Sequence, residues 1–264
     1  IYTLSLHDAL PIWSAENGIK VVLDATRAME NAYFIKVREE GYADKSVKEI
    51  LREMCSYTDA ATCSGKKDFH TNIGGFAACN DDDAATQMRA YVVVYEGLQT
   101  YGGMAGRDME AMARGMLEAC NDDTMRHRIA QSEYLGNKLI EAGIPVIHPI
   151  GGHGVFIDAK AFYPNVPQKH YVAQALAADL YVQSGVRSME RGIVSAGRDK
   201  VTGHEHEPKL ETIRLTIPRR VYTQSHFDIV ADGVVELYKE RSKARGLKMV
   251  YEPKARRPDR KSVV

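Results

Sequence analysis

The segment that most constrains the fold is a short apolar run that stops at an acid. Residues 19–23 have the sequence Ile-Lys-Val-Val-Leu, which predicts a buried strand, and Asp24 follows directly. Residues 27–40 then carry apolar side chains at roughly the helical period, so a helix is expected after the strand. In an open α/β sheet, ligands bind at the carboxyl ends of the strands. Asp24 is therefore predicted to lie at the ligand-binding edge of such a sheet.

A second informative stretch is a turn that contains two adjacent lysines. Residues 60–63 predict another strand, and residues 64–68 continue as Ser-Gly-Lys-Lys-Asp. A lysine amine forms a Schiff base with an aldehyde cofactor when its pKa is lowered, and a neighbouring cation lowers it. A serine hydroxyl and the backbone N–H groups near a glycine can bind phosphate. The pattern alone is more typical of a solvated loop.

An acid at a strand end and a lysine in a later turn together suit pyridoxal phosphate. A carboxylate that pairs with the pyridinium nitrogen keeps it protonated, which lets the ring accept electrons. Asp24 also precedes a predicted helix, so an N-cap is the alternative for it. The residues by themselves leave both alternatives open.

Composition excludes several classes of partner. The chain has 35 basic and 35 acidic residues among 264, so nothing favours nucleic acid or an anionic membrane. No apolar run approaches the length of a membrane span. The four cysteines show neither CxxC nor metal-ligand spacing, which predicts reduced, mostly buried thiols. We expect a cytoplasmic protein with a small-molecule substrate.

Both ends of the sequence are expected to be foreign to the protein. Residues 2–12 can be encoded by a string that resembles a common sequencing adapter. Residues 259–264 can be encoded by the reverse complement of the part that encodes residues 7–12. We therefore assign residues 1–12 and 259–264 to translated adapter, and expect a fragment cut at both ends.

The intervening sequence predicts two domains, residues 13–120 and 121–258. In the first we expect a helix over 46–54 with a Ser46–Glu49 capping box, a strand over 75–79, and a helix from 81 that runs into a strand over 91–94. A glycine-rich loop over 97–106 and a helix over 107–120 follow. In the second we expect helices over 121–142 and 172–184 and a last helix that Ser225 caps. Strands are expected over 145–147, 152–158, 186–189 and 212–216, and a flexible loop over 192–209.

Five motifs carry a resemblance to a known family. They lie at residues 24–27, 64–68, 95–97, 101–103 and 214–219, within a match from about 17 to 254. Together they resemble the β-eliminating lyases. The resemblance implies an α/β fold, namely part of a fold-type I PLP-dependent (aspartate aminotransferase-like) large domain plus a small α+β C-terminal domain. It also implies amino-acid catabolism by a homotetramer.

The same resemblance assigns roles at the cofactor. Lys67 would form the Schiff base with pyridoxal 5'-phosphate and then remove the Cα proton of the substrate. Asp24 would pair with the ring nitrogen, Arg27 would bind the phenolic oxygen, and Ser64 would contact the phosphate. Lys66 would supply positive charge beside Lys67.

Further roles concern the substrate and a cation. Arg214 would hold the substrate carboxylate with a bidentate fork. Arg191 would bind the oxygen of a phenol leaving group, which favours L-tyrosine cleavage to phenol, pyruvate and ammonia. The Asn72 carbonyl would be one ligand of a monovalent cation (K+). His153 is either a supporting residue of the site or a structural one.

Two alternatives remain. Gln224, Gln99 and Gly154 depart from the tyrosine-cleaving pattern, and Gln224 resembles the branch that releases indole from tryptophan. The family's main phosphate-binding loop and leaving-group acid lie in an N-terminal half that is missing here. The fragment itself is therefore expected to be inactive, although the parent gene would encode an enzyme.

Overall fold

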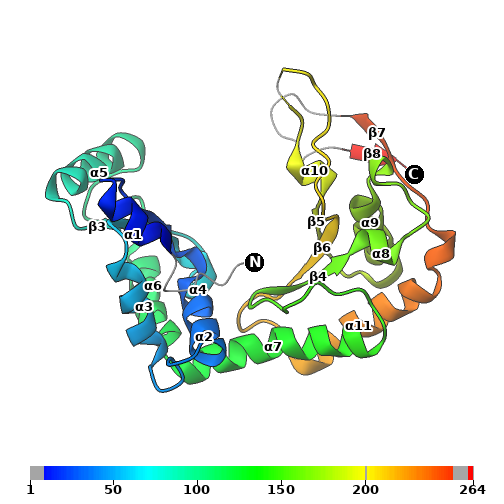
Figure 1. The fold of residues 1–264 in the computed structure, drawn as a ribbon, viewed down its shortest axis with the longest axis horizontal. Helices are drawn as coiled ribbons and strands as arrows, with labels where there is room; N and C mark the ends of the chain where they lie inside the picture. The colour runs from blue at the N-terminus through cyan, green and yellow to red at the C-terminus, as the bar shows by residue number, and fades with distance from the viewer. Residues whose placement is uncertain (1–8, 200, 252–260, 264) are drawn as a thin grey trace. The chain divides into compact units, whose positions relative to one another are not determined.

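The computed structural model describes residues 9–199, 201–251 and 261–263, with side chains from residue 13 to 251. The chain divides into two compact units, residues 1–127 and 128–264, and each is described by itself (Figure 1). The division falls inside helix α7 (Asp122–Glu141). Residues 1–8, 259, 260 and 264 of the expected adapter segments lie outside the described residues. Residues 9–12 begin α1 (Ala9–Glu16), and β8 (Lys261–Val263) pairs with β7 (Lys248–Tyr251).

The first unit is built on a three-stranded sheet in the order β1-β2-β3. β1 (Val22–Asp24) runs parallel to β2 (Ala60–Ser64), and β2 runs antiparallel to β3 (Gly75–Cys79). Asp24 is aligned with Thr62, so β2 extends beyond the end of β1 to Ser64. The carboxyl ends of β1 and β2 therefore lie at the same edge of the sheet, as predicted.

Helices pack around this sheet and form one apolar core. The helices of this unit are η1 (Ala25–Arg27), α2 (Ala28–Arg38), α3 (Val47–Ser56), α4 (Gly65–Asp68), α5 (Asp82–Tyr95) and α6 (Gly106–Ala119). The predicted capping box is confirmed, because Ser46 accepts from the N–H of Glu49 while the Glu49 carboxylate accepts from the N–H of Ser46. Met29, Ala32 and Ile35 of α2 are buried against α3.

Three expectations for this unit are wrong. β1 is not buried, since Val22 is 60% exposed. Val37, one of the apolar side chains in the stripe expected over 27–40, is 53% exposed, whereas Ile35 is buried in the core. Residues 91–94 form no strand: α5 continues unbroken from an Asp81 N-cap to Tyr95, which satisfies the backbone within the helix.

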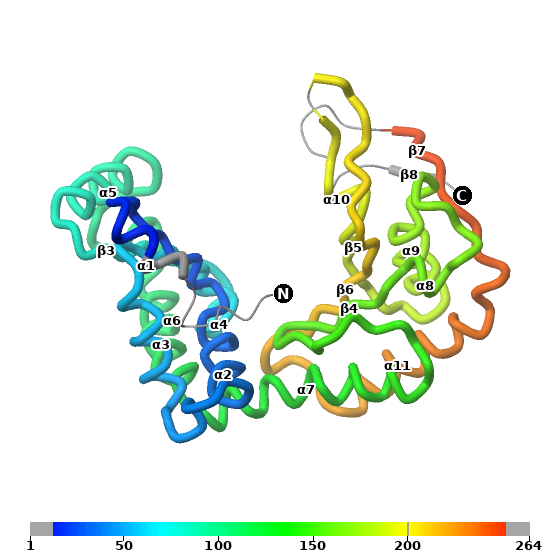
Figure 2. Tube along the Cα trace, in the orientation of Figure 1, coloured from blue at the N-terminus to red at the C-terminus, as the bar shows by residue number. Residues whose placement is uncertain are grey.

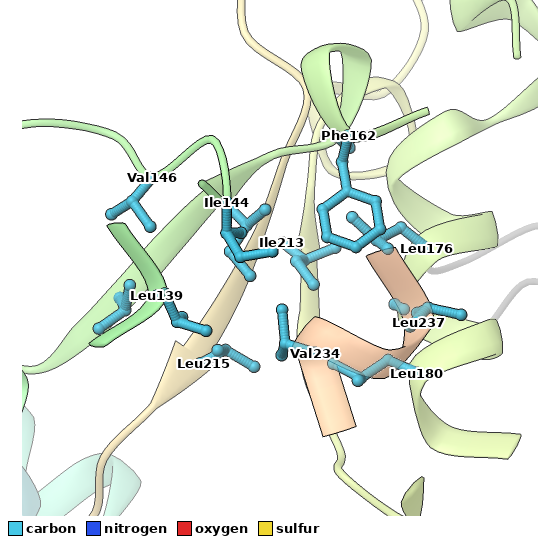
Figure 3. Close-up of a cluster of buried hydrophobic side chains, with 14 of the residues drawn as sticks. Leu139, Ile144, Val146, Phe162, Leu176, Leu180, Ile213, Leu215, Val234 and Leu237 are labelled. Carbon is cyan, nitrogen blue, oxygen red and sulfur yellow. The ribbon is translucent and has the colours of Figure 1, made fainter. Parts of the chain in front are cut away.

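The second unit contains a three-stranded antiparallel sheet in the order β4-β6-β5. Its strands are β4 (Gly154–Asp158), β5 (Met189–Arg191) and β6 (Thr212–Thr216). Helices α9 (Val172–Ser184) and α11 (Gln224–Lys239) lie on one face. On that face, Ile213 and Leu215 of β6 point toward Val234 of α11 (Figure 3). The sheet's other face carries Arg214 and Thr216 of β6 together with Phe156 of β4 and Met189 of β5.

The predicted elements of the second unit are partly confirmed. The helix over 172–184 and the strand over 212–216 have the predicted bounds, and Gly185 ends the helix with a φ of 70°. Thr223, not Ser225, caps α11, because its side chain and that of His226 form the reciprocal cap. Residues 145–147 contribute an isolated bridge from Val146 to Ile157 instead of a strand.

The remaining differences lie around β5. The strand occupies Met189–Arg191, three residues later than its predicted start. The segment over 192–209 is more regular than a flexible loop: it begins with α10 (Ile193–Ala196), and Arg198 then bridges to Glu205. Figure 2 traces this excursion between α10 and β6. Hydrogen bonds of its backbone and side chains order this segment, although its polar composition predicted a flexible loop.

Candidate functional site

A cleft of about 580 Å³ lies at the carboxyl ends of β1 and β2. Small-molecule sites commonly measure about 300–1,000 Å³, so its size suits a cofactor. It opens beside the strand ends, where an open α/β sheet binds ligands. The cleft is lined by Asp24, Thr26, Thr62, Cys63, Ser64, Lys66, Asn72, Ile73, Gly74 and Phe76.

Asp24 presents a negatively charged carboxylate to this cleft. Its Oδ1 accepts a hydrogen bond from the N–H of Thr26 at 3.1 Å, which makes Asp24 the N-cap of η1. Hydrogen bonds from Thr26, followed by the charge of Arg27, hold the pKa of Asp24 below its usual value. The N-cap alternative is thus observed, and it leaves an exposed carboxylate in the cleft.

Arg27 offers a donor that lacks an acceptor. It ends η1, and its Nε is buried with no hydrogen-bond partner among the described residues. A buried unpaired donor is unfavourable unless a ligand or water satisfies it. The Arg27 Nε can therefore donate a hydrogen bond to a ligand close to Asp24.

The two lysines lie on the short helix α4, which begins where β2 ends. Ser64 is its N-cap residue, and within the described chain its hydroxyl makes no capping hydrogen bond. Lys66 is exposed and lines the cleft, whereas Lys67 is half-buried on the next position. The structure thus brings Asp24, Ser64, Lys66 and Asn72 to one cleft, with Lys67 beside it.

Asp68 anchors this lysine turn, a role that the sequence analysis missed. The residue is fully buried, and its Oδ2 accepts from the N–H groups of Met29 at 3.0 Å and Glu30 at 3.4 Å. A carboxylate at the first turn of α2 also complements the helix dipole. The partners lie 38 and 39 residues upstream, so no local pattern could have predicted the contact.

Two glycines allow the turn to close tightly. The N–H of Gly65 donates to the carbonyl of Gly74 at 2.9 Å. A Cβ on Gly65 would lie 2.8 Å from Met112 Cε and 2.9 Å from Thr71 Oγ1. A Cβ on Gly75 would lie 2.3 Å from the carbonyl oxygen of Cys63. Positions 65 and 75, on either side of the lysines, therefore need glycine for the chain to pack this closely.

The arginines predicted to bind substrate lie together in the second unit. Arg191 is aligned with Thr212, and Arg214 is aligned with Met189, so the arginines are diagonal neighbours on one sheet face. The Arg214 Nε donates to Thr216 Oγ1 at 2.9 Å, and Nη2 lies 3.0 Å from Met189 Sδ. Alternation places this face opposite Ile213 and the core. Two guanidinium groups on one polar face can bind an anion such as a carboxylate.

Other predicted groups have ordinary roles. The four cysteines are free thiols, but the expectation that they are mostly buried is wrong: Cys63 is buried, Cys79 and Cys120 are half-buried, and Cys55 is exposed. Burial raises the pKa of Cys63 to about 12, and its Sγ lies 3.3 Å from the carbonyl oxygen of Ala25. The His153 ring packs edge-on against Phe156. Cys63 therefore lines the cleft as a neutral thiol.

The described residues include neither a membrane-spanning helix nor a metal-binding group of side chains. No helix in that part of the chain is long and apolar enough to cross a membrane. Within the same residues, no three His, Cys, Asp or Glu side chains are grouped so as to hold a metal ion.

Comparison with known proteins identifies close relatives. A family model described as beta-eliminating lyase matches residues 2–233. A tyrosine phenol-lyase from Symbiobacterium thermophilum is 62% identical over 237 residues, covering 90% of this chain and 52% of that protein. Another from Fusobacterium nucleatum subsp. nucleatum is 59% identical over 239 residues, with the same coverage of both chains. The chain spans about half the length of the curated relatives it matches.

Solved structures support the fold. A serine palmitoyltransferase from S. paucimobilis with a bound PLP–myriocin aldimine aligns with a TM-score of 0.58 at 13% identity, covering 89% of this chain and 51% of that one. A serine palmitoyltransferase from Sphingomonas wittichii aligns with a TM-score of 0.56. The described chain therefore has the α/β architecture of part of a fold-type I PLP-dependent protein.

Proposed function

The chain belongs to the beta-eliminating lyase family, and we propose that the complete protein is a PLP-dependent carbon–carbon lyase. The reaction is the α,β-elimination of L-tyrosine, in which tyrosine and water give phenol, pyruvate and ammonia. The observation that carries this proposal is the cleft in which Asp24, the last residue of β1, and the lysine turn after β2 come together. The tyrosine phenol-lyases at 59–62% identity support the choice of substrate.

The residues of the cleft fit pyridoxal 5'-phosphate. Asp24 has a lowered pKa and is ionised at neutral pH, so it can hold a protonated ring nitrogen. The unpaired Nε of Arg27 can donate to the phenolic oxygen, and the hydroxyl of Ser64 can bind the phosphate. When bound, the cofactor supplies an electron sink for the charge that develops at the substrate Cα.

We assign attachment of the cofactor and proton transfer to Lys67. Its amine removes the Cα proton of the substrate and therefore has to be neutral when it acts. The positive charge of adjacent Lys66 lowers the pKa of such an amine. Asp68 supports both functions, because its bonds to the start of α2 hold the turn in place.

The arginines of β5 and β6 are assigned to the substrate. Arg214 binds the α-carboxylate, for which its planar guanidinium offers two parallel donors. Arg191 donates to the oxygen of the phenol ring and so helps hold the leaving group. A site that provides a donor for this oxygen favours a substrate that carries it over one that does not.

Further features are proposed from family resemblance. The Asn72 backbone carbonyl is one ligand of K+, and Asn72 does line the cleft. The complete protein is a cytoplasmic homotetramer. The chain by itself spans only half the length of its relatives, and we propose that it is inactive alone.

Tryptophan cleavage is the second candidate. Gln224, which departs from the tyrosine-cleaving pattern, begins α11 and donates to the Tyr134 hydroxyl at 3.1 Å. A change at this position can alter the shape available to a leaving group without affecting the cofactor residues. Indole release in place of phenol release would support this candidate.

A product assay of the complete protein decides between the candidates. With added pyridoxal phosphate, L-tyrosine should give equimolar phenol and pyruvate, and the Arg191→Ala variant should lose most of this activity. L-Tryptophan should give little indole. Indole as the main product would transfer the assignment to tryptophan, and pyruvate from neither substrate would refute the lyase proposal.

A further inference from the structure

Two buried acids adjoin Arg191, and nothing in the proposed reaction uses them. Glu190 is 7% exposed and Glu211 is fully buried. Side chains alternate along β5, so Glu190 points into the unit while Arg191 points outward. Burying carboxyl groups is costly unless hydrogen bonds compensate it, so their contacts indicate what they do.

Glu190 holds the chain that follows Arg191. Its Oε1 accepts from the N–H of Val194 at 3.1 Å, and its Oε2 accepts from the N–H of Ser195 at 3.0 Å. The Ser195 hydroxyl adds a hydrogen bond to the same Oε2 at 2.7 Å. One carboxylate thus fixes the first turn of α10, immediately after the strand that ends in Arg191.

Glu211, which directly precedes β6, holds the same segment. Its Oε1 accepts from the N–H of Ile193 at 2.7 Å and from Gln168 Nε2 at 2.9 Å. A Cβ on Gly192 would lie 2.1 Å from Glu211 Oε2. The Glu211 carboxyl group is buried and its Oε1 accepts two hydrogen bonds, so a side chain at position 192 would displace a held group.

The backbone of Arg191 is also bonded directly. Its carbonyl oxygen accepts from Thr212 Oγ1 at 3.2 Å, from the strand position with which Arg191 is aligned. The backbone is therefore fixed at residue 191 and at residues 193, 194 and 195. The Arg191 side chain is exposed, so its direction depends on this backbone.

We propose that Glu190 and Glu211 are positioning residues that fix the direction of the Arg191 guanidinium toward the leaving-group oxygen. This inference rests on the proposed function, because that function gives Arg191 its substrate. A hydrogen bond to a leaving group is directional, and a misplacement of about 1 Å can reduce the rate about a hundredfold. The three residues at 190–192 then act together. Glu190 anchors the backbone, Arg191 binds the substrate, and Gly192 leaves room for the side chain of Glu211.

The test compares two substrates in the complete protein with its cofactor bound. L-Tyrosine needs a donor at the leaving-group oxygen. β-Chloro-L-alanine does not, since its C–Cl bond breaks, chloride leaves with the electron pair, and water then yields pyruvate and ammonia. For Glu190→Ala, kcat/KM for tyrosine should fall about a hundredfold, mainly through kcat, while kcat/KM for chloroalanine stays within about twofold.

Milder and control variants keep the test independent of folding. Ser195→Ala removes one hydrogen bond to Glu190 and should lower tyrosine activity by less, again without affecting chloroalanine. Gly192→Ala should act like Glu190→Ala. Glu207→Gln, an exposed acid between α10 and β6, is the matched control and should affect neither substrate.

A double-substitution cycle completes the experiment. If Glu190 acts through Arg191, the variant with Glu190→Ala and Arg191→Ala together should be no slower with tyrosine than Arg191→Ala alone. Additive losses, or equal losses with both substrates, would overturn the positioning role. Absence of chloroalanine elimination by the unsubstituted protein would instead refute the proposed lyase function.

Discussion

At the residue scale, the charge state of single carboxyl groups decides what each can do. Asp24 is exposed and hydrogen-bonded by Thr26, so its pKa is lowered and it carries a full charge in the cleft. Glu211 is buried, and burial, with Glu190 nearby, raises its pKa. Two acids of similar intrinsic acidity therefore serve as a charged ligand-binding group and as an internal anchor.

This contrast predicts a pH dependence of stability. A carboxyl whose pKa is raised by folding binds its proton more tightly in the folded state, so stability is lost as pH rises from the unfolded pKa toward the folded one. For Glu211 this window begins at the ordinary glutamate pKa of 4.5. Glu211→Gln keeps the side-chain size but cannot ionise. As pH rises above 4.5, the free energy of unfolding of this variant should therefore decrease less than that of the unsubstituted protein. Urea denaturation from pH 4 to 8 measures both, and parallel curves would contradict the prediction.

Asp24 yields a prediction about the cofactor. Asp24→Ala should weaken pyridoxal phosphate binding by about tenfold or more, because the ring nitrogen loses its charged partner. Titration of the complete protein with the cofactor, followed by its visible absorbance, gives the affinity. Asp82→Ala, at an exposed acid in the first turn of α5, is the control. Equal affinities for both variants would remove Asp24 from the site.

At the scale of elements, the lysine turn is stable because it is attached to α2. Asp68 joins the end of α4 to the first turn of α2 through two backbone N–H groups. Its replacement by alanine leaves those donors buried without this acceptor, which costs about 1–3 kcal/mol. Urea denaturation should show that loss for Asp68→Ala and almost none for Asp82→Ala. A loss under about 0.5 kcal/mol, the range of ordinary surface changes, would contradict the anchoring role.

The same scale shows what the sequence could predict. Local signals placed several elements well: the Ser46 capping box, the strand over 212–216, and the helix that Gly185 ends. The remaining features depend on contacts between residues far apart in the sequence. The apolar run in α5 suggests a strand by composition, yet the helix continues through it. The anchors Asp68 and Glu211 have partners far along the chain, so no spacing rule reveals them.

At the scale of the whole molecule, part of the apolar surface has no cover within the described chain. In α5 and the loop after it, Tyr91, Val94, Tyr95 and Leu98 are each more than half exposed, and Val22 exposes the outer side of β1. Exposed apolar patches of this kind mark interaction surfaces or aggregation liabilities. Within the described residues, nothing covers these side chains.

We therefore predict that the isolated chain self-associates. Light scattering at increasing concentration should show oligomers, and replacing Val94 and Leu98 with lysine should reduce them without changing the helix content measured by circular dichroism. The isolated chain should also give no phenol from tyrosine. A monodisperse monomer would contradict the role assigned to this surface.

The most direct measurement identifies the lysine that holds the cofactor. The complete protein with bound pyridoxal phosphate is reduced with borohydride, digested, and mapped by mass spectrometry. The account predicts one pyridoxyl group, on Lys67, and its loss together with the visible absorbance band in Lys67→Ala. Labelling of Lys66, which lines the cleft, or of a lysine outside α4 would contradict the assignment.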